Sequence, residues 1–200
     1  DLPAWYKDHG SMFISGAINK YIYITYHQSQ FDPRIRLRYS KMEEVENIDE
    51  IQHEIIKETF RSVGLTKNVE LTSHAEIPSG TGLGSSGSFG VGIFHAIMGE
   101  WAKKDFLAEE ATRIQIDILK HPIGLQDQYV ASYGGVNLYK IKRNGEVSLY
   151  PVSPPQGLVL FFTGFKRDAN EVLKSSTLEG LERIQELAWA TKKALENRDF

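Results

Sequence analysis

The first part of the chain alternates hydrophobic and polar residues with the period of a β-strand. One of these runs is built from β-branched and aromatic residues, which is typical of strands. Another interleaves three arginines with two aliphatic residues, so that the arginines share one face. The runs that predict strands are 12–15, 21–26, 34–39 and 69–73.

Other segments repeat their apolar residues with the period of an α-helix. In residues 49–63 the apolar positions follow i, i+4 spacing, and residues 106–119 predict a further helix. Between these two segments an apolar stripe consists of Phe89, Ile93, Phe94, Ile97, Met98 and Trp101. Near the end of the chain, residues 168–175 and 178–196 also predict helices.

Strand patterns return after the middle helices. Residues 136–139 and 147–150 predict the two strands of a hairpin, because Asn144-Gly145 between them suits a tight turn. The apolar run 158–162 predicts a buried strand. The mixture of helices and strands predicts an α+β or α/β fold.

Composition narrows the class of protein. The chain of 200 residues has 23 Lys and Arg against 26 Asp and Glu, giving a net charge of −3. This charge favours no nucleic-acid partner. No apolar run is long enough for a membrane span, so no membrane partner is expected. The absence of Cys excludes disulfides and thiol catalysis, and together with the absence of an export signal it predicts a cytoplasmic protein.

Residues 78–90 form an unusual glycine- and serine-rich segment, Pro-Ser-Gly-Thr-Gly-Leu-Gly-Ser-Ser-Gly-Ser-Phe-Gly, immediately before the apolar stripe. Glycine inside a helix costs about 1 kcal/mol relative to Ala, so Gly87, Gly90 and Gly92 need a reason. Close packing of the helix on a sheet is one explanation. The other is anion binding, because the backbone N–H groups and the dipole at a helix N-terminus bind phosphate.

Three known glycine-containing motifs do not account for this segment. The Walker A pattern fails because Ser88 stands where that motif requires Lys. Gly82 to Gly87 matches GxGxxG, but a dinucleotide-binding fold requires a strand that runs directly into the first glycine. The nucleophile elbow GxSxG is absent.

The segment Pro78 to Ser86, read as Pro-x-x-x-Gly-Leu-Gly-Ser-Ser, resembles the phosphate loop of the GHMP kinases. Further segments are similar to the branch that phosphorylates heptose 7-phosphate at its anomeric hydroxyl. The sequence segments that carry this similarity are Asp1-Leu2-Pro3, Tyr39-Ser40-Lys41, Ile51-Gln52-His53, Glu76-Ile77-Pro78, Ile123 to Tyr129, Ala131 to Asn137 and Phe161 to Gly164.

The resemblance implies the GHMP kinase fold, an α+β architecture. It implies an N-terminal domain with an α/β fold like that of ribosomal protein S5 over residues 1–153, which carries the phosphate loop. Residues 154–200 would begin a ferredoxin-like C-terminal domain and would be a truncated part of it. The implied function is an ATP-dependent sugar kinase, with D-glycero-D-manno-heptose 7-phosphate as the first candidate substrate.

The same resemblance implies roles for individual residues. Asp127 would be the catalytic base toward the acceptor hydroxyl, with an ordinary N-terminal helix carboxylate as the alternative. Mg²⁺ would be bound by Ser86, and Gln115 occupies the position of a second, acidic ligand. The ATP phosphates would be bound by Gly80, Thr81, Gly82, Leu83, Gly84, Ser85, Ser86, Gly87 and Ser88. Substrate would be contacted by Asp1, Gln126, Gln128, Tyr129, Gly134 and Gly135.

Several alternatives stay open at this stage. Asp1 could be an unordered terminus, and His53 a core histidine. Lys20, Arg34, Arg36 and Arg38 either neutralise a substrate phosphate or belong to a solvated strand face. The protein could be a fucokinase-like or other hexose 1-kinase, a degenerate GHMP protein that binds nucleotide or sugar without transfer, or a dinucleotide-dependent oxidoreductase. A homodimer is equally open.

Overall fold

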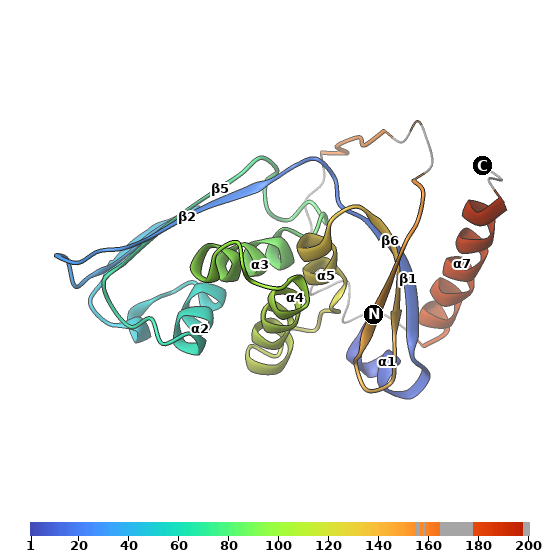
Figure 1. The fold of residues 1–200 in the computed structure, drawn as a ribbon, viewed down its shortest axis with the longest axis horizontal. Helices are drawn as coiled ribbons and strands as arrows, with labels where there is room; N and C mark the ends of the chain where they lie inside the picture. The colour runs from blue at the N-terminus through green and yellow to red at the C-terminus, as the bar shows by residue number, and fades with distance from the viewer. Residues whose placement is uncertain (155–156, 158, 165–177, 198–200) are drawn as a thin grey trace.

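The computed structural model describes residues 1–154, 157, 159–164 and 178–197. Figure 1 shows a long sheet at one end of the molecule, a group of helices in the middle, and a second sheet with a helix beside it at the other end. None of the helices in the described ranges is long and apolar enough to cross a membrane.

The larger sheet has the strand order β2-β5-β3-β4. The β3 and β5 strands are parallel, and the other neighbours are antiparallel. Its inner face carries aliphatic side chains that are fully buried, because the alternation of the strand directs every second residue to the same side. The strands are β2 (Ile22–Gln28), β3 (Ile35–Arg38), β4 (Met42–Val45) and β5 (Val69–Ala75).

Two helices cover this inner face, as their apolar periodicity predicts. The short 3-10 helix η1 (Ile48–Glu50) leads into α2 (Glu54–Ser62), which packs beside α3 (Ser85–Met98). The core between sheet and helices includes Ile35, Leu37, Ile55, Ile56, Phe60, Val69, Leu71, Phe89 and Ile93.

The smaller sheet has the order β1-β6-β7 and is antiparallel throughout. Its hairpin is the predicted one, with Gly145 at a φ of 87° in the turn. The elements around this sheet are α1 (Pro3–His9), β1 (Ser11–Gly16), α4 (Lys104–Thr112), the π-helix η2 (Arg113–Ile118), α5 (Gln126–Tyr133), β6 (Val136–Ile141), β7 (Val147–Pro151) and α7 (Leu178–Asn197).

The helix α7 lies against the smaller sheet, where it contacts β1 (Figure 1). The indole Nε1 of Trp5 donates a hydrogen bond to Oε1 of Gln185 at 2.9 Å. Lys140 lies over the rings of Tyr150 and Trp189, at 5.2 and 5.9 Å from their centroids. The predicted helix 178–196 is therefore confirmed, whereas the predicted helix 168–175 lies outside the described residues.

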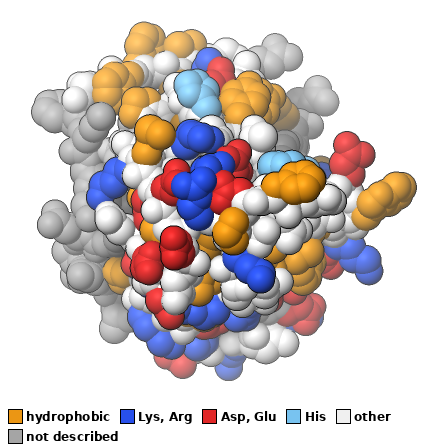
Figure 2. All heavy atoms as spheres, turned by 90° about the vertical axis from the view of Figure 1, so that its left-hand side faces the viewer, with side chains coloured by type: hydrophobic (Ala, Val, Ile, Leu, Met, Phe, Trp, Pro, Cys, Tyr) orange, Lys and Arg blue, Asp and Glu red, His pale blue; other side chains and the backbone are white. Residues whose placement is uncertain are grey.

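Arg34, just before β3, and the arginines of β3 lie on the solvent face of the larger sheet and are paired there with acidic side chains. The Arg34 guanidinium binds Asp32 at 2.8 Å and also Glu44, and Arg36 binds Glu70 at 3.0 Å. Figure 2 shows basic and acidic side chains in contact at this end of the molecule. The interpretation as a solvated strand face is thus confirmed for these arginines.

Two predictions from apolar patterns are wrong. Residues 159–162 form no strand, and Phe161 is 80% exposed. A strand needs a neighbour to satisfy its backbone N–H groups, and no described strand lies beside this run. Trp101 lies beyond the end of α3, which stops at Gly99, and it is 96% exposed. An apolar residue is buried only where another part of the protein covers it, and apolar composition does not show whether such a surface is present.

Two predicted helices have different boundaries in the structure. The segment 49–63 is divided, because His53 has an extended backbone and forms the N-cap of α2. The segment 106–119 begins earlier, at Lys104, and continues from α4 into the π-helix η2. Both segments are helical as predicted, but their internal breaks leave no signal in the hydrophobic period.

Candidate functional site

The glycine-rich loop connects β5 to α3 and owes its course to three glycines. Gly80, Gly82 and Gly84 have φ angles of 78°, 76° and 69°, in the left-handed region that side chains disfavour. Gly84 is also the N-cap of α3, and no side chain caps this helix. Because the first N–H groups of a helix have no partner within it, this N-terminus offers donors to an anion.

The glycines within α3 serve close packing instead. A Cβ at Gly87 would lie 2.6 Å from the Cβ of Asp127, and one at Gly90 would lie 2.9 Å from Nε2 of Gln115. A Cβ at Gly92 would lie 2.8 Å from Cδ1 of Ile24. Close packing therefore explains the glycines within α3, while anion binding by the preceding loop stays a prediction.

Asp127 lies in the first turn of α5, directly against the N-terminal end of α3. A Cβ at Gly84 would approach its Cγ to 2.9 Å, which shows how closely the carboxyl group adjoins the loop. Among the described residues, no hydrogen bond or ion pair engages this carboxylate. It is therefore free to accept a proton from a ligand.

Desolvation by the surrounding protein raises the pKa of Asp127 above its ordinary value. Removing water disfavours the charged form of a carboxyl group, and no nearby cation reverses the effect. A carboxylate with a raised pKa is a stronger base, which suits a group that must take a proton from a hydroxyl.

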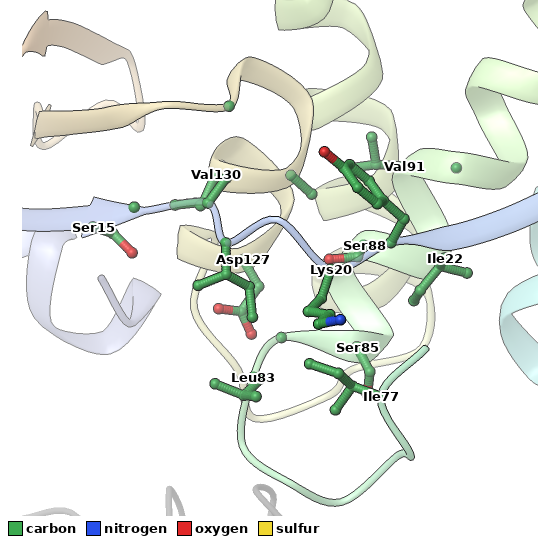
Figure 3. Close-up of a pocket in the computed structure, with 18 of the residues that line it drawn as sticks. Ser15, Lys20, Ile22, Ile77, Leu83, Ser85, Ser88, Val91, Asp127 and Val130 are labelled. Atoms are coloured by element: carbon green, nitrogen blue, oxygen red, sulfur yellow. The ribbon is translucent and has the colours of Figure 1, made fainter. Parts of the chain in front are cut away.

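A cavity of about 770 Å³ opens between α3, α5, the glycine-rich loop and the connection from β1 to β2. Figure 3 shows Asp127, Ser85, Ser88 and Lys20 around this opening, and the apolar residues Ile22, Ile77 and Val91 also line it. The predicted site residues that line it are Gly82, Leu83, Gly84, Ser85, Ser88, Gln126, Asp127, Gly134 and Gly135.

Asp1 is hydrogen-bonded to Gln126, a residue that lines this cavity. Its carboxylate Oδ2 accepts a hydrogen bond from the backbone N–H of Gln126 at 2.8 Å. The side chain of Gln126 donates in turn to Oγ of Ser15 at 3.2 Å. Gly124 makes room for Asp1, since a Cβ there would overlap the carboxyl group. Asp1 is thus ordered, and it lies next to the catalytic candidate in space.

Ser86 and Gln115 form a pair beside the loop. The hydroxyl of Ser86 donates to Oε1 of Gln115 at 3.0 Å, and Nε2 of Gln115 donates to the carbonyl of Ala111 at 3.4 Å. Gln115 is fully buried, so its amide orients the serine. The hydroxyl oxygen of Ser86 suits an Mg²⁺ ion whose other ligands are mostly phosphate oxygens and water molecules. No group of three or more His, Asp or Glu in the described ranges is arranged to bind a metal by itself.

The structure does not bring every predicted residue to the cavity. Gln128 and Tyr129 are buried on the inner side of α5, where Tyr129 stacks on Tyr133 with centroids 6.2 Å apart. Neither amide atom of Gln128 has a hydrogen-bond partner among the described residues. The hydroxyl of Thr81 donates to the carbonyl of Pro78, which closes the outer turn of the loop. Helix periodicity explains the burial, because consecutive residues of α5 face different sides.

Two other segments that carry the family resemblance meet beneath α3. The ring of His53 packs against Tyr39 and Phe89, with centroids 4.8 and 5.1 Å away. Glu43 accepts hydrogen bonds from the Tyr39 hydroxyl at 2.5 Å and from the backbone N–H of Gln52 at 2.7 Å. Burial lowers the pKa of His53, so the ring is neutral and belongs to the packing of the larger sheet.

Sequence reasoning missed most of the wall formed by the connection between β1 and β2. Residues 15–22 line the cavity together with His95, Val130 and Ala131. Gly16 at the end of β1 and Lys20 in the connection were the available signals, and Lys20 was one of several candidate cations. The arginines considered with it are held by acidic residues on the far sheet face.

The fold is shared with solved kinases. A D-glycero-D-manno-heptose 1-phosphate kinase from Bacteriodes thetaiotaomicron superposes with a TM-score of 0.76 at 21% identity, over 98% of this chain and 67% of that one. The mevalonate kinase of Methanococcus jannaschii superposes with a TM-score of 0.66 at 18% identity, over 98% of this chain and 69% of that one. The chain therefore has the GHMP kinase fold, as the motifs predict.

Sequence comparison finds a family similarity in the middle of the chain. Residues 50–135 match the family described as the GHMP kinases N terminal domain. The matched range includes the glycine-rich loop, Gln115 and Asp127. A doubly wound parallel sheet, which the dinucleotide alternative requires, is not formed, because β3 and β5 are the parallel pair among the described strands.

The chain is also similar in sequence to a curated sugar-phosphate kinase. The D-glycero-alpha-D-manno-heptose 7-phosphate kinase of Campylobacter jejuni is 28% identical over 65% of this chain. The match covers 44% of that protein, so the chain spans less than half of the length of this relative.

Proposed function

We propose that this protein is an ATP-dependent sugar kinase that phosphorylates an anomeric hydroxyl, with D-glycero-D-manno-heptose 7-phosphate as its substrate. The observation that carries the proposal is the unpaired Asp127 carboxylate at the N-terminal end of α3, beside the glycine-rich loop and open to one cavity. The names of the curated relative and of the heptose kinase structure support the choice of substrate.

In this proposal the loop 80–88 and the N-terminus of α3 bind the ATP phosphates through backbone N–H groups and hydroxyls. Mg²⁺ on the nucleotide, with Ser86 as a ligand oriented by Gln115, would offset the phosphate charge. Asp1, Gln126, Gly134 and Gly135 form the part of the site assigned to the sugar.

The reaction then needs one proton acceptor. The anomeric oxygen attacks the γ-phosphorus, the bond from that phosphorus to the β–γ bridging oxygen breaks, and ADP leaves. Asp127 takes the hydroxyl proton, and the raised pKa of its carboxyl group favours this transfer. The proposed division of the chain assigns residues 1–153 to the loop-bearing domain and residues 154–200 to the start of the second.

A transfer assay tests this function. The protein is incubated with Mg²⁺–ATP and a panel of D-glycero-D-manno-heptose 7-phosphate, the unphosphorylated heptose, L-fucose and D-galactose, and ADP release is followed. We expect turnover with the heptose 7-phosphate above the other sugars. A preference for fucose or galactose would overturn the substrate, and ATP binding without turnover of any sugar would overturn the kinase assignment.

One observation favours a second candidate, a protein that binds nucleotide or sugar without transfer. Gln115 is neutral, and its carbonyl oxygen is already occupied by Ser86, so it supplies no charge to Mg²⁺. Calorimetry with Mg²⁺–AMP-PNP beside the transfer assay separates the two functions. If the second holds, Gln115→Glu strengthens Mg²⁺-dependent nucleotide binding, whereas wild-type turnover excludes it.

A further inference from the structure

The connection between β1 and β2 brings a cation to the cavity wall. Residues 17–21 run along the opening, and Lys20 lies there with Ser85 and Ser88 across from it (Figure 3). Of the residues that line the cavity in the described ranges, Lys20 is the one lysine or arginine. Within the described lining, an anionic ligand in this cavity can therefore pair with one lysine or arginine, which is Lys20.

Glu76 holds this connection in place at the start of the glycine-rich loop. Its backbone N–H donates to the carbonyl of Tyr21 at 3.1 Å, and its Oε2 accepts from the N–H of Tyr21 at 2.7 Å. Glu76 also directly precedes Ile77 and Pro78. The position of Lys20 is therefore fixed relative to the loop by two hydrogen bonds between Glu76 and the backbone of Tyr21, which do not involve the Lys20 side chain.

The ammonium group of Lys20 keeps most of its binding capacity. It lies 3.7 Å from Oε1 of Glu76, with about half of its side chain exposed. Charge-assisted hydrogen bonds are about 2.7–2.9 Å long, so this is a loose ion pair. An ammonium carries three donors, and at this distance Glu76 keeps the group near the cavity without satisfying it.

The distribution of charge around the cavity indicates a role for Lys20. The segment 78–90 contains no Lys or Arg, and its donors are neutral amides and hydroxyls. The Asp127 carboxylate, which also lines the cavity, repels a phosphate group. Besides Mg²⁺ carried by the nucleotide, a cation that offsets this repulsion must come from outside the loop, and Lys20 is the lysine that the described part of the fold places at the cavity.

We propose that Lys20, positioned by Glu76, binds a phosphate group of a ligand in this cavity. This assignment rests on the proposed function and names a residue that acts in it. The phosphate belongs either to the bound nucleotide or to a phosphorylated acceptor, and the chemistry of recognition is the same for both. The binding experiment distinguishes the two sources.

The test is calorimetry on the 200-residue chain with three probes: Mg²⁺–AMP-PNP, D-glycero-D-manno-heptose 7-phosphate and unphosphorylated D-glycero-D-manno-heptose. We expect Lys20→Met to weaken binding of one phosphorylated probe by about tenfold or more, as the loss of a charged hydrogen bond implies. Which probe loses affinity identifies the source. Lys20→Arg keeps the charge and should retain most of the binding.

Lys142→Met is the matched control, because Lys142 is an exposed lysine in an ion pair with Glu146, outside the cavity lining. It should bind all probes like the wild type. Equal affinities of Lys20→Met and wild type for both phosphorylated probes would overturn the role of Lys20 alone. If the wild type binds neither phosphorylated probe, both this assignment and the proposed function are overturned.

Discussion

Asp127 combines three properties that seldom occur together in an aspartate. Its carboxylate faces a cavity, has no partner among the described residues, and has a pKa that desolvation raises. An acidic residue in the first turn of a helix is ordinarily stabilising and solvated. Here the close approach of Gly84 and Gly87 displaces water from the carboxyl group. The position therefore favours proton transfer over stability.

We expect Asp127→Asn to lower phosphoryl transfer by about 10²–10⁴-fold, because an amide cannot accept the hydroxyl proton. Nucleotide binding should remain. In the wild type the rate should rise with pH as Asp127 loses its proton, with a midpoint above the ordinary aspartate range because the pKa is raised. Initial rates from pH 4 to 9 measure this. Asp105→Asn, in the first turn of α4 outside the cavity, is the control, and equal rates in the two variants would exclude Asp127 from the reaction.

The same substitution should stabilise the fold at neutral pH. A carboxyl group whose pKa is raised by folding contributes stability below its unfolded pKa, about 3.9, and loses that contribution as the pH rises through the folded value. At pH 7 the wild type therefore carries a desolvated charge that Asp127→Asn removes. We expect a higher melting temperature for this variant at pH 7 and no difference below about pH 4. A lower melting temperature at pH 7 would contradict the desolvation of Asp127.

At the scale of elements, α3 is positioned by glycines at both of its ends. Gly84 at the N-cap and Gly99 at the C-cap have φ angles of 69° and 78°. Their surroundings differ, because a Cβ at Gly84 would meet the Asp127 carboxyl group at 2.9 Å, whereas a Cβ at Gly99 would meet nothing within 4 Å. Substitutions at the two ends of α3 therefore distinguish the effect of backbone strain from the effect of crowding against Asp127.

We expect Gly84→Ala to cost about 1–2 kcal/mol of stability, because Gly84 has a left-handed backbone. Gly99→Ala should cost about 1–3 kcal/mol, because its φ of 78° with a ψ of −174° is a conformation that essentially only glycine adopts. Gly84→Ala should in addition displace Asp127 and reduce transfer strongly, while Gly99→Ala leaves the rate per folded molecule unchanged. Thermal unfolding and transfer assays on both variants provide the comparison. Equal activity in the two variants would show that the contact between Gly84 and Asp127 does not matter for the reaction.

At the scale of the molecule, helices α3, α4 and α5 join the two sheets, and the cavity lies where the elements of both meet. The run 159–162 stands apart from both cores. Phe161 and Phe162 are 80% and 68% exposed, although such a composition is typical of a buried strand. Large exposed aromatic side chains bind apolar probes and contribute little to the stability of the domain that carries them.

We expect the double substitution Phe161→Ser and Phe162→Ser to change the free energy of unfolding by no more than about 1 kcal/mol, because each exposed position contributes within about 0.5 kcal/mol. It should also lower the fluorescence of the apolar dye ANS. Phe60→Ala, at a fully buried position of the larger core, should cost about 3–5 kcal/mol. Urea unfolding and dye titration test both, and a loss in the double variant equal to that of Phe60→Ala would show that the run is packed in solution.

Local patterns predicted most of the elements because they depend on neighbours along the chain. The strand predicted from the alternation in residues 21–26 and the hairpin turn predicted at Asn144-Gly145 are both present in the structure. Burial of the run 159–162 could not be predicted in this way, since it depends on a partner surface. The break at His53 likewise depends on its contacts with Tyr39 and Phe89.

By itself, the sequence determined most of the helix-forming and strand-forming segments and the glycine-rich motif, because each is encoded by residues close together in the chain. The role of Asp127 as candidate base came from the resemblance to the GHMP kinases. The tertiary structure alone decided which candidates share a cavity. It joined Asp1 to Gln126, withdrew Gln128 and Tyr129 into the core, and separated Lys20 from the arginines of β3. These outcomes depend on helix phase and on long-range packing, which sequence spacing does not specify.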